Sequence, residues 1–217
     1  MSIKYIHTVS FFYVCVSEII VTLCIDSVTM DKVFIHDKVF VPFIPYDKIS
    51  QIIDGVADRL NEDFCDTDHS YAKRSEKDIP VLLCVLHGSI MFTGELLQRI
   101  NFPVELASMK LSSYVGTTST GVVKETMPLS TDIKGRTVIV CEDIVDTGNT
   151  IIALKKKLLE TGAKDVRICT MLLKPEVFCG KEKLDYVGAE IPNRFIVGFG
   201  LDYDELGRNL KDIYVLE

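Results

Sequence analysis

The sequence predicts an α/β protein built around a mostly parallel β-sheet. Short apolar runs alternate along the chain with segments whose apolar residues recur at helical spacing, as a parallel sheet with crossover helices requires. The chain has 217 residues, 47% of them hydrophobic, so it can bury one substantial core. We therefore expect one main domain, with its binding site beyond the carboxyl ends of the strands.

The elements are expected in a regular order. An extended stretch over residues 39–45 leads into a first helix, whose apolar stripe includes Ile49, Ile53 and Leu60. Residues 61–78 are polar, without an apolar period, and are expected to form a surface loop. Strands are expected over residues 79–86, 104–111, 138–141, 166–173 and 195–199. Two further helices are expected over residues 89–100 and 150–160, the second closed by Gly162.

Charge and cysteine content narrow the class of protein. Asp and Glu outnumber Lys and Arg by 31 to 24, a net charge of -7, which argues against binding to nucleic acid or to an acidic membrane. The seven cysteines include no C-x-x-C pair and no Cys/His cluster, which favours reduced thiols in a cytoplasmic protein. Cys84 and Cys141 lie in apolar strand runs and are expected to be buried.

Residues 1–30 are expected to be an atypical N-terminal segment ahead of a single domain over residues 31–217. Residues 9–25 are largely apolar, but Ser10, Ser17 and Glu18 interrupt them. The segment is too interrupted for a membrane span and lacks a convincing signal-peptide cleavage site. We expect no membrane association and interpret the segment as a β-rich part packed on the small subdomain or as an unusual start. Secretion or anchoring is the alternative.

The most informative run spans residues 138–150. An apolar strand is followed within five positions by Glu142, Asp143 and Asp146, and a small polar turn then opens a helix. Carboxylates crowded beside a core strand lose hydration and repel one another unless a divalent cation or sugar hydroxyls compensate. The free N–H groups at the helix start suit a phosphate. The alternative is an exposed acidic turn in which Asp146 or Thr147 is an ordinary N-cap.

This run resembles the motif that binds phosphoribosyl pyrophosphate (PRPP) in the type I phosphoribosyltransferases. It is most similar to the 6-oxopurine branch, the hypoxanthine-guanine phosphoribosyltransferases, because its third acid is Asp146 where other branches usually carry a small residue. The likeness extends from about residue 33 to the C-terminus. It implies a central, mostly parallel sheet flanked by helices, with a small hood subdomain formed by the N- and C-terminal segments.

The resemblance also implies a reaction. This is the Mg²⁺-dependent transfer of the 5-phosphoribosyl group from PRPP to hypoxanthine or guanine, which gives IMP or GMP and pyrophosphate. Asp146 would be the general base that accepts the N7 proton of the purine. Glu142, Asp143 and Asp202 would hold Mg²⁺. The residues implied in ribose and phosphate binding are Glu142, Asp143, Asp146, Thr147, Gly148, Asn149 and Thr150.

Pyrophosphate is expected, again by resemblance, at His87, Gly88 and Arg208. The family's turn at residues 86–89 commonly contains a non-proline cis peptide, and it carries lysine or arginine where this chain has His87. Histidine is mostly neutral at pH 7, so we expect PRPP to bind more weakly than in the family and to bind more tightly after His87→Lys.

The purine and the lid complete the implied site. Lys174 would donate to the 6-oxo group, which excludes adenine because an amino group would face another donor. Ser113 and Tyr114 match the lid that closes over the reacting centre and excludes water. The other residues implied in purine binding are Phe195, which would stack on the ring, Arg194 and Ile196 beside it, and Asp202 near the exocyclic amine of guanine.

Two other classes stay open as alternatives. One is a regulator that binds nucleotide or RNA on the same fold, and the other is a paralogue with weakened activity, suggested by His87 and the N-terminal segment. The sequence contains neither a P-loop nor a strand-linked dinucleotide-binding glycine motif. Family members usually form dimers or tetramers, so we expect a homo-oligomer that takes small-molecule substrates only.

Overall fold

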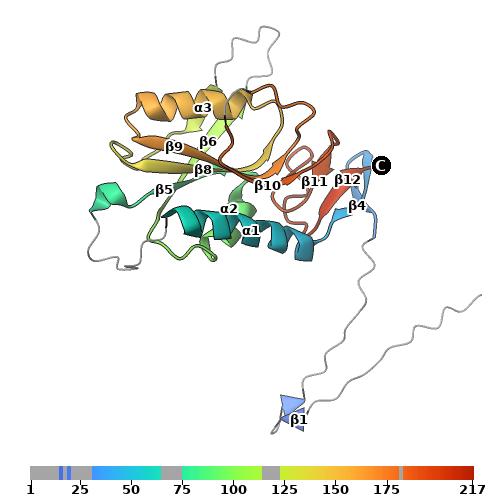
Figure 1. The fold of residues 1–217 in the computed structure, drawn as a ribbon. Helices are drawn as coiled ribbons and strands as arrows, with labels where there is room; N and C mark the ends of the chain where they lie inside the picture. The colour runs from blue at the N-terminus through green and yellow to red at the C-terminus, as the bar shows by residue number, and fades with distance from the viewer. Residues whose placement is uncertain (1–14, 17–18, 21–30, 65–74, 114–122, 181–182) are drawn as a thin grey trace, which may run out of the picture. The chain divides into compact units, whose positions relative to one another are not determined.

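The computed structural model describes residues 15–16, 19–20, 31–64, 75–113, 123–180 and 183–217 (Figure 1). The chain divides into two compact units, Met1–Asp31 and Lys32–Glu217. In the first unit, β1 (Cys15–Val16) pairs antiparallel with β2 (Ile19–Ile20). Within these described ranges, no helix has both the length and the apolar character needed to cross a membrane.

The second unit is built on a six-stranded sheet with the order β10-β9-β8-β5-β6-β7 (Figure 1). Its strands are β5 (Val81–Leu86), β6 (Glu105–Ser113), β7 (Val123–Met127), β8 (Thr137–Val145), β9 (Asp165–Leu173) and β10 (Tyr186–Glu190). All neighbours are parallel except β6 and β7, which are antiparallel. The predicted mostly parallel α/β sheet is therefore confirmed. The sequence does not indicate the edge strands β7 and β10, because both are short and lack a long apolar run.

Helices cover both faces of this sheet. α1 (Tyr46–Phe64) and α2 (Ile90–Leu97) pack on one face and α3 (Asn149–Glu160) packs on the other (Figure 1). Because side chains alternate along a strand, Leu82 and Ile139 pack with α1 and α2, whereas Leu83 and Val140 pack with α3. A strand buried on both faces is a nearly continuous apolar run, which is why the sequence predicts these central strands.

α1 is longer than predicted. Residues 61–64, expected to begin a surface loop, continue the helix, and Phe64 stacks on Phe102 with 5.2 Å between ring centroids. This tertiary contact stabilises a last helical turn whose sequence is mostly polar. Farther along the predicted loop lies a short 3₁₀ turn, η2 (Glu76–Asp78). Residues 65–74 lie outside the described residues.

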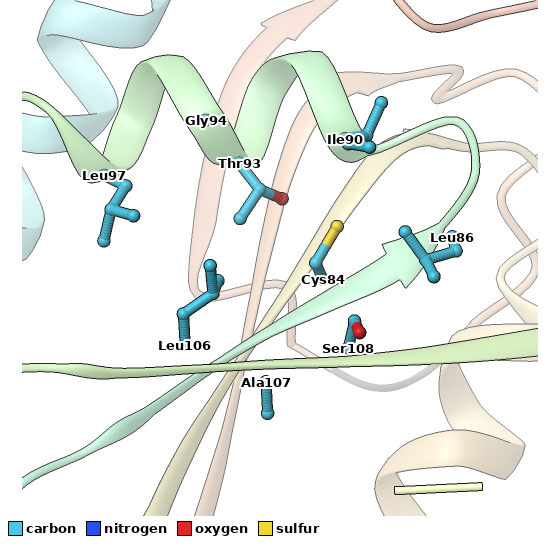
Figure 2. Close-up of a pocket in the computed structure, with 9 residues that line it drawn as sticks. All are labelled: Cys84, Leu86, Ile90, Thr93, Gly94, Leu97, Leu106, Ala107 and Ser108. Carbon is cyan, nitrogen blue, oxygen red and sulfur yellow. The ribbon is translucent and has the colours of Figure 1, made fainter. Parts of the chain in front are cut away.

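A mostly apolar hollow of about 360 Å³ lies between α2 and the strands β5 and β6 (Figure 2). Cys84 lines it from β5, Leu106 and Ser108 line it from β6, and Thr93 lines it from α2. Burial raises the pKa of the Cys84 thiol, as befits the predicted buried residue. None of the described residues that line this hollow is charged, so an anionic substrate is not expected there.

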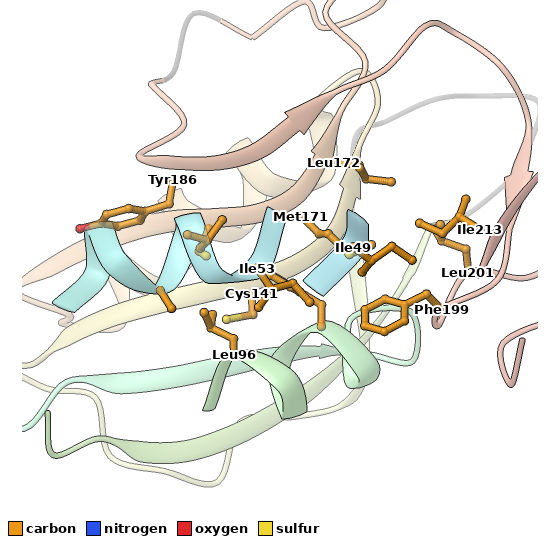
Figure 3. Close-up of a cluster of buried hydrophobic side chains, with 14 of the residues drawn as sticks. Ile49, Ile53, Leu96, Cys141, Met171, Leu172, Tyr186, Phe199, Leu201 and Ile213 are labelled. Carbon is orange, nitrogen blue, oxygen red and sulfur yellow. The ribbon is translucent and has the colours of Figure 1, made fainter. Parts of the chain in front are cut away.

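The core on the α1 and α2 side extends from the central sheet to the C-terminal segment (Figure 3). Ile49 of α1 and Leu96 of α2 belong to one cluster with Cys141 of β8, Phe199 and Ile213. Cys141 is fully buried and free, which confirms the prediction for that residue. Because the cluster contains residues from both the central sheet and the C-terminal segment, it fixes one against the other.

A second, antiparallel sheet has the order β11-β12-β4-β3. Its strands are β3 (Val33–Ile35), β4 (Lys38–Ile44), β11 (Ile196–Val197) and β12 (Ile213–Leu216). The sheet joins N- and C-terminal segments, as the predicted hood requires. The strand expected over residues 195–199 is reduced to two residues, because Gly198 and Phe199 have φ angles of 103° and 49° and leave the extended conformation.

The sheet registers decide what meets at the candidate site. β8 runs as far as Val145, so Glu142 and Asp143 lie within the strand, whereas the sequence predicted that they follow it. Val145 pairs directly with Leu173, the last residue of β9. The carboxyl ends of neighbouring parallel strands therefore lie side by side, at the edge where open α/β sheets bind their ligands.

Candidate active site

Two adjacent acids of β8 lie at the centre of the candidate site. Glu142 Oε2 is buried and has no hydrogen-bond partner among the described residues. Burial, reinforced by the charge of Asp143, raises the pKa of Glu142 well above its usual range. Asp143 Oδ1 accepts a hydrogen bond from the Ile144 N–H at 2.8 Å, yet burial raises the pKa of Asp143 to about 6. The protein therefore supplies too little positive charge to compensate these carboxylates.

The turn after β5 packs directly against Asp143. The Leu86–His87 peptide bond is cis, as the family resemblance implies. A Cβ atom on Gly88 would lie 1.8 Å from Asp143 Oδ2, so only glycine allows this approach. A Cβ atom on Gly200 would likewise lie 2.0 Å from Gly88 O. The end of β5, the acidic part of β8 and the loop at Gly200 are thus in direct contact.

Arg208 joins this cluster from the C-terminal segment. Its Nη1 donates to Gly200 O at 2.8 Å, and its Nη2 lies 2.7 Å from Asp202 Oδ1. Gly200 packs against Gly88, which lies against Asp143, so Arg208 is held on the same side of the site, and its positive charge opposes the effect of burial on the pKa of Asp143. The fold thereby gathers Gly88 and Arg208, two of the three residues predicted to bind pyrophosphate, around one carboxylate.

A polar hollow of about 160 Å³ opens at the start of α3. Six of the seven residues predicted to bind ribose and phosphate line it, Asp143 being the exception. Gly148 is the N-cap residue, with a φ of 82°, a conformation that favours glycine. The alternative in which Asp146 or Thr147 is the N-cap is therefore wrong. The first N–H groups of a helix have no acceptor within it, so the hollow suits a phosphate.

Lys174 and Asp146 form an ion pair at the ends of β9 and β8. The distance from Lys174 Nζ to Asp146 Oδ1 is 2.8 Å, and the Lys174 N–H donates to Val145 O at 3.0 Å. Lys174 is only 7% exposed, so its ammonium needs a partner. The Asp146 side chain is 53% exposed and stays accessible. Sequence reasoning named both residues but did not predict their contact.

Three of the other residues predicted to bind the purine, Arg194, Phe195 and Ile196, lie where the chain enters the second sheet. Phe195 is 45% exposed, and its ring meets that of Tyr203 edge to face, with 5.8 Å between centroids. Ile196 is buried in β11. Arg194 Nη2 donates to Leu216 O at 2.8 Å, so its guanidinium is engaged within the sheet. Phe195 alone of the three offers an exposed aromatic surface.

Comparison with known proteins decides the family. Residues 48–204 match the family model for the phosphoribosyl transferase domain. The chain is also 45% identical over 139 residues to a hypoxanthine-guanine phosphoribosyltransferase of Streptococcus thermophilus, an alignment that covers 64% of this chain and 77% of that protein. The chain belongs to the hypoxanthine-guanine phosphoribosyltransferase family.

Solved structures of family members agree with this assignment. The hypoxanthine-guanine phosphoribosyltransferase of Bacillus anthracis has a TM-score of 0.72 at 33% identity and covers 81% of this chain and 98% of its own. The hypoxanthine phosphoribosyltransferase of Trypanosoma cruzi has a TM-score of 0.73 at 34% identity, with coverages of 81% and 94%. The family and the fold that the resemblance predicted are confirmed.

One residue departs from the usual pattern of this family. His87 stands where the family usually carries a lysine or arginine, and its Nε2 lies 2.8 Å from Lys110 Nζ. Leu86 and Lys110 are directly paired in β5 and β6, so the sheet register brings Lys110 to the turn. Sequence reasoning did not single out Lys110, because a register between strands separated by a helix leaves no local pattern.

The structure describes only part of the predicted lid of this family member, together with its predicted metal ligands. Ser113 is the last residue of β6, and Tyr114 lies outside the described residues. In the described part of the chain, no group of three or more His, Cys, Asp and Glu side chains is arranged to hold a metal. Asp202 is already engaged by Arg208 and accepts from the Glu205 N–H at 2.8 Å.

Proposed function

We propose that this chain transfers the 5-phosphoribosyl group of PRPP to hypoxanthine or guanine, giving IMP or GMP and pyrophosphate. One observation carries the proposal. The polar hollow at the start of α3 and the Lys174–Asp146 pair meet at one edge of the sheet, because Asp146 belongs to both. A sugar phosphate held in the hollow thus presents its ribose toward a base that Lys174 and Asp146 contact.

We assign phosphate and ribose binding to the residues of β8 and of the turn after it. In this proposal, the backbone N–H groups and hydroxyls of residues 147–150 hold the 5′-phosphate, since the helix N-terminus favours negative charge. Glu142 and Asp143 accept hydrogen bonds from the ribose hydroxyls. Their raised pKa values and the unpartnered Glu142 Oε2 support this role, because such donors would satisfy them.

The same two acids fit a divalent cation. Mg²⁺ is usually held by one or two carboxylates together with substrate phosphates and water, so a site without three protein ligands suits it. We propose Glu142 and Asp143 as ligands, with Asp202 as a third that would have to exchange its contact with Arg208. When bound, Mg²⁺ would neutralise charge on the pyrophosphate leaving group.

The purine is assigned to Asp146, Lys174 and Phe195. Asp146 accepts the proton from N7 as the new bond to the anomeric carbon forms, which makes it the general base. Lys174 donates to the 6-oxo group, which an adenine amino group could not accept. Phe195 stacks on the ring with its exposed face, and Ser113 and Tyr114 form the lid that keeps water from the ribosyl cation.

A purine panel tests the proposed function. The purified full chain is assayed with PRPP, MgCl₂ and hypoxanthine, guanine, xanthine or adenine, and pyrophosphate and nucleotide are both quantified. We expect IMP from hypoxanthine, GMP from guanine and no AMP from adenine. Product from adenine alone, or from no purine at all, would refute the assignment.

The family match does not favour the alternative of a binding regulator. We propose in addition that the protein is cytoplasmic, takes only small-molecule substrates and self-associates as a dimer or tetramer. Its excess of acidic residues supports the absence of nucleic-acid binding. Size-exclusion chromatography with light scattering would measure the oligomeric state of the full chain. A monomer at micromolar concentration would contradict the proposed self-association.

A further inference from the structure

At the pyrophosphate end of the site, a lysine of β6, Lys110, contacts the histidine of the turn after β5, His87. Lys110 Nζ lies 2.8 Å from His87 Nε2. An ammonium can only donate hydrogen bonds, so in this contact Lys110 Nζ donates and His87 Nε2 accepts. The positive charge at this turn therefore belongs to Lys110, on the neighbouring strand.

The fold holds both partners in place. His87 adjoins Gly88, which lies against the Asp143 carboxylate with no room for a side chain. Lys110 is paired in register with Leu86, the last residue of β5, and Thr126 Oγ1 donates to Lys110 O at 3.3 Å. With the backbones on both sides fixed, the long lysine side chain reaches the turn and its end is oriented by the imidazole.

We propose that His87 and Lys110 act together as the cationic element of the pyrophosphate site. Lys110 supplies the positive charge that attracts the pyrophosphate group of PRPP, and His87 positions its ammonium by accepting a hydrogen bond from it. The inference rests on the proposed function and deepens it, since it names a positioning residue and a charge donor for the same substrate. Histidine at position 87 then does not weaken PRPP binding, because Lys110 of β6 supplies the positive charge instead.

The first test removes the charge and restores it. Lys110→Gln should raise the KM for PRPP and weaken the binding of pyrophosphate, measured by calorimetry in MgCl₂, by about tenfold each. It should leave the KM for hypoxanthine within about twofold. Lys110→Arg keeps the charge and should recover most of the PRPP affinity. Lys48→Gln removes an exposed lysine of α1 whose ammonium donates to Gln51 Oε1 at 3.4 Å; it is the matched control and should change neither constant.

The second test asks whether the two residues work as a unit. In the natural background, His87→Lys should not tighten PRPP binding, because two ammonium groups would repel at this distance. In the Lys110→Gln background, the same change should restore most of the lost affinity. This outcome differs from the expectation from sequence alone, in which His87→Lys tightens binding outright.

The outcomes separate this inference from the proposed function. If the natural chain makes IMP and GMP while Lys110→Gln leaves the PRPP and pyrophosphate constants unchanged, the pair is refuted and the function stands. If the natural chain transfers the phosphoribosyl group to no purine, both the proposed function and the inference are refuted. Thermal melting shows which variants fold. Should Lys110→Gln not fold, a roughly tenfold tighter PRPP affinity in His87→Lys alone would overturn the inference, and an unchanged or weaker affinity would support it.

Discussion

Asp146 and Lys174 are joined by an ion pair of 2.8 Å, although 27 residues separate them in sequence. Each follows the last residue of its strand, and those last residues, Val145 and Leu173, are directly paired in the sheet. The register therefore places the proposed general base beside the proposed 6-oxo donor. Both groups would contact one purine ring, so the pair orients the two before substrate arrives.

Replacing Asp146 should separate binding from turnover. Asp146→Asn keeps the size of the side chain but cannot accept the N7 proton, so turnover should fall by about 10²-fold or more, while the KM for PRPP changes little. Steady-state kinetics with hypoxanthine measure both constants. Asp58→Asn, on the exposed face of α1, is the matched control. Normal turnover in Asp146→Asn would rule out its role as the base.

Lys174 should govern the choice of purine. Lys174→Ala removes a charged hydrogen-bond donor, an interaction whose loss costs about 1.5–3 kcal/mol, so kcat/KM for hypoxanthine and guanine should fall by roughly 10- to 100-fold. Adenine, which is not expected to react, is measured as a competitive inhibitor, and its inhibition constant should not weaken because no favourable contact is lost. Competition assays with the three bases give the ratio. A parallel loss for all three would show that Lys174 acts only in folding.

The Asp143 carboxylate should lower the stability of the folded protein above pH 6 while being required for activity. Its folded pKa of about 6 lies above the ordinary value of 3.8, so between these pH values the native state holds a proton that the unfolded state has released. Stability therefore decreases as the pH rises from about 4 to about 6. Asp143→Asn should raise Tm by roughly 2–6 °C above pH 6, give no gain near pH 4 and abolish transfer.

The measurement for Asp143 is a series of melting curves from pH 4 to pH 8, recorded without substrate. The difference in Tm between Asp143→Asn and the natural chain should grow with pH and level off above about pH 6. Asp58→Asn should follow the natural chain throughout. A difference that is constant over the whole range would mean that burial of this carboxylate does not destabilise the ionised protein.

Gly88 should tolerate no side chain. Gly88→Ala would place a Cβ atom 1.8 Å from Asp143 Oδ2, so the turn or the acid must move and transfer should fall at least about tenfold, as expected when a catalytic geometry shifts by about 1 Å. Gly55→Ala is the matched control, because a Cβ at Gly55 meets nothing within 4 Å and alanine favours the helix by up to about 1 kcal/mol. Equal activities in the two variants would contradict the packing.

The sequence predicted the central strands and the acidic motif well because their signals are local. The run over residues 138–150 places three acids and a helix start within a few positions, and the structure gathers six of the seven predicted ribose and phosphate residues around one hollow. The edge strand β10 (Tyr186–Glu190) and the last turn of α1 were not predicted. Both depend on contacts with distant parts of the chain, such as Phe64 on Phe102.

By itself, the sequence determined the order of strands and helices, the identity of the acidic and small polar residues at the carboxyl end of β8, and the family they belong to. These follow from apolar periodicity and from residues adjacent in the chain. Only the tertiary structure decided that Lys174 meets Asp146, that Lys110 reaches His87 and that Gly88 touches Asp143. Each of these contacts depends on strand register or on the packing of separate segments, which no local spacing records.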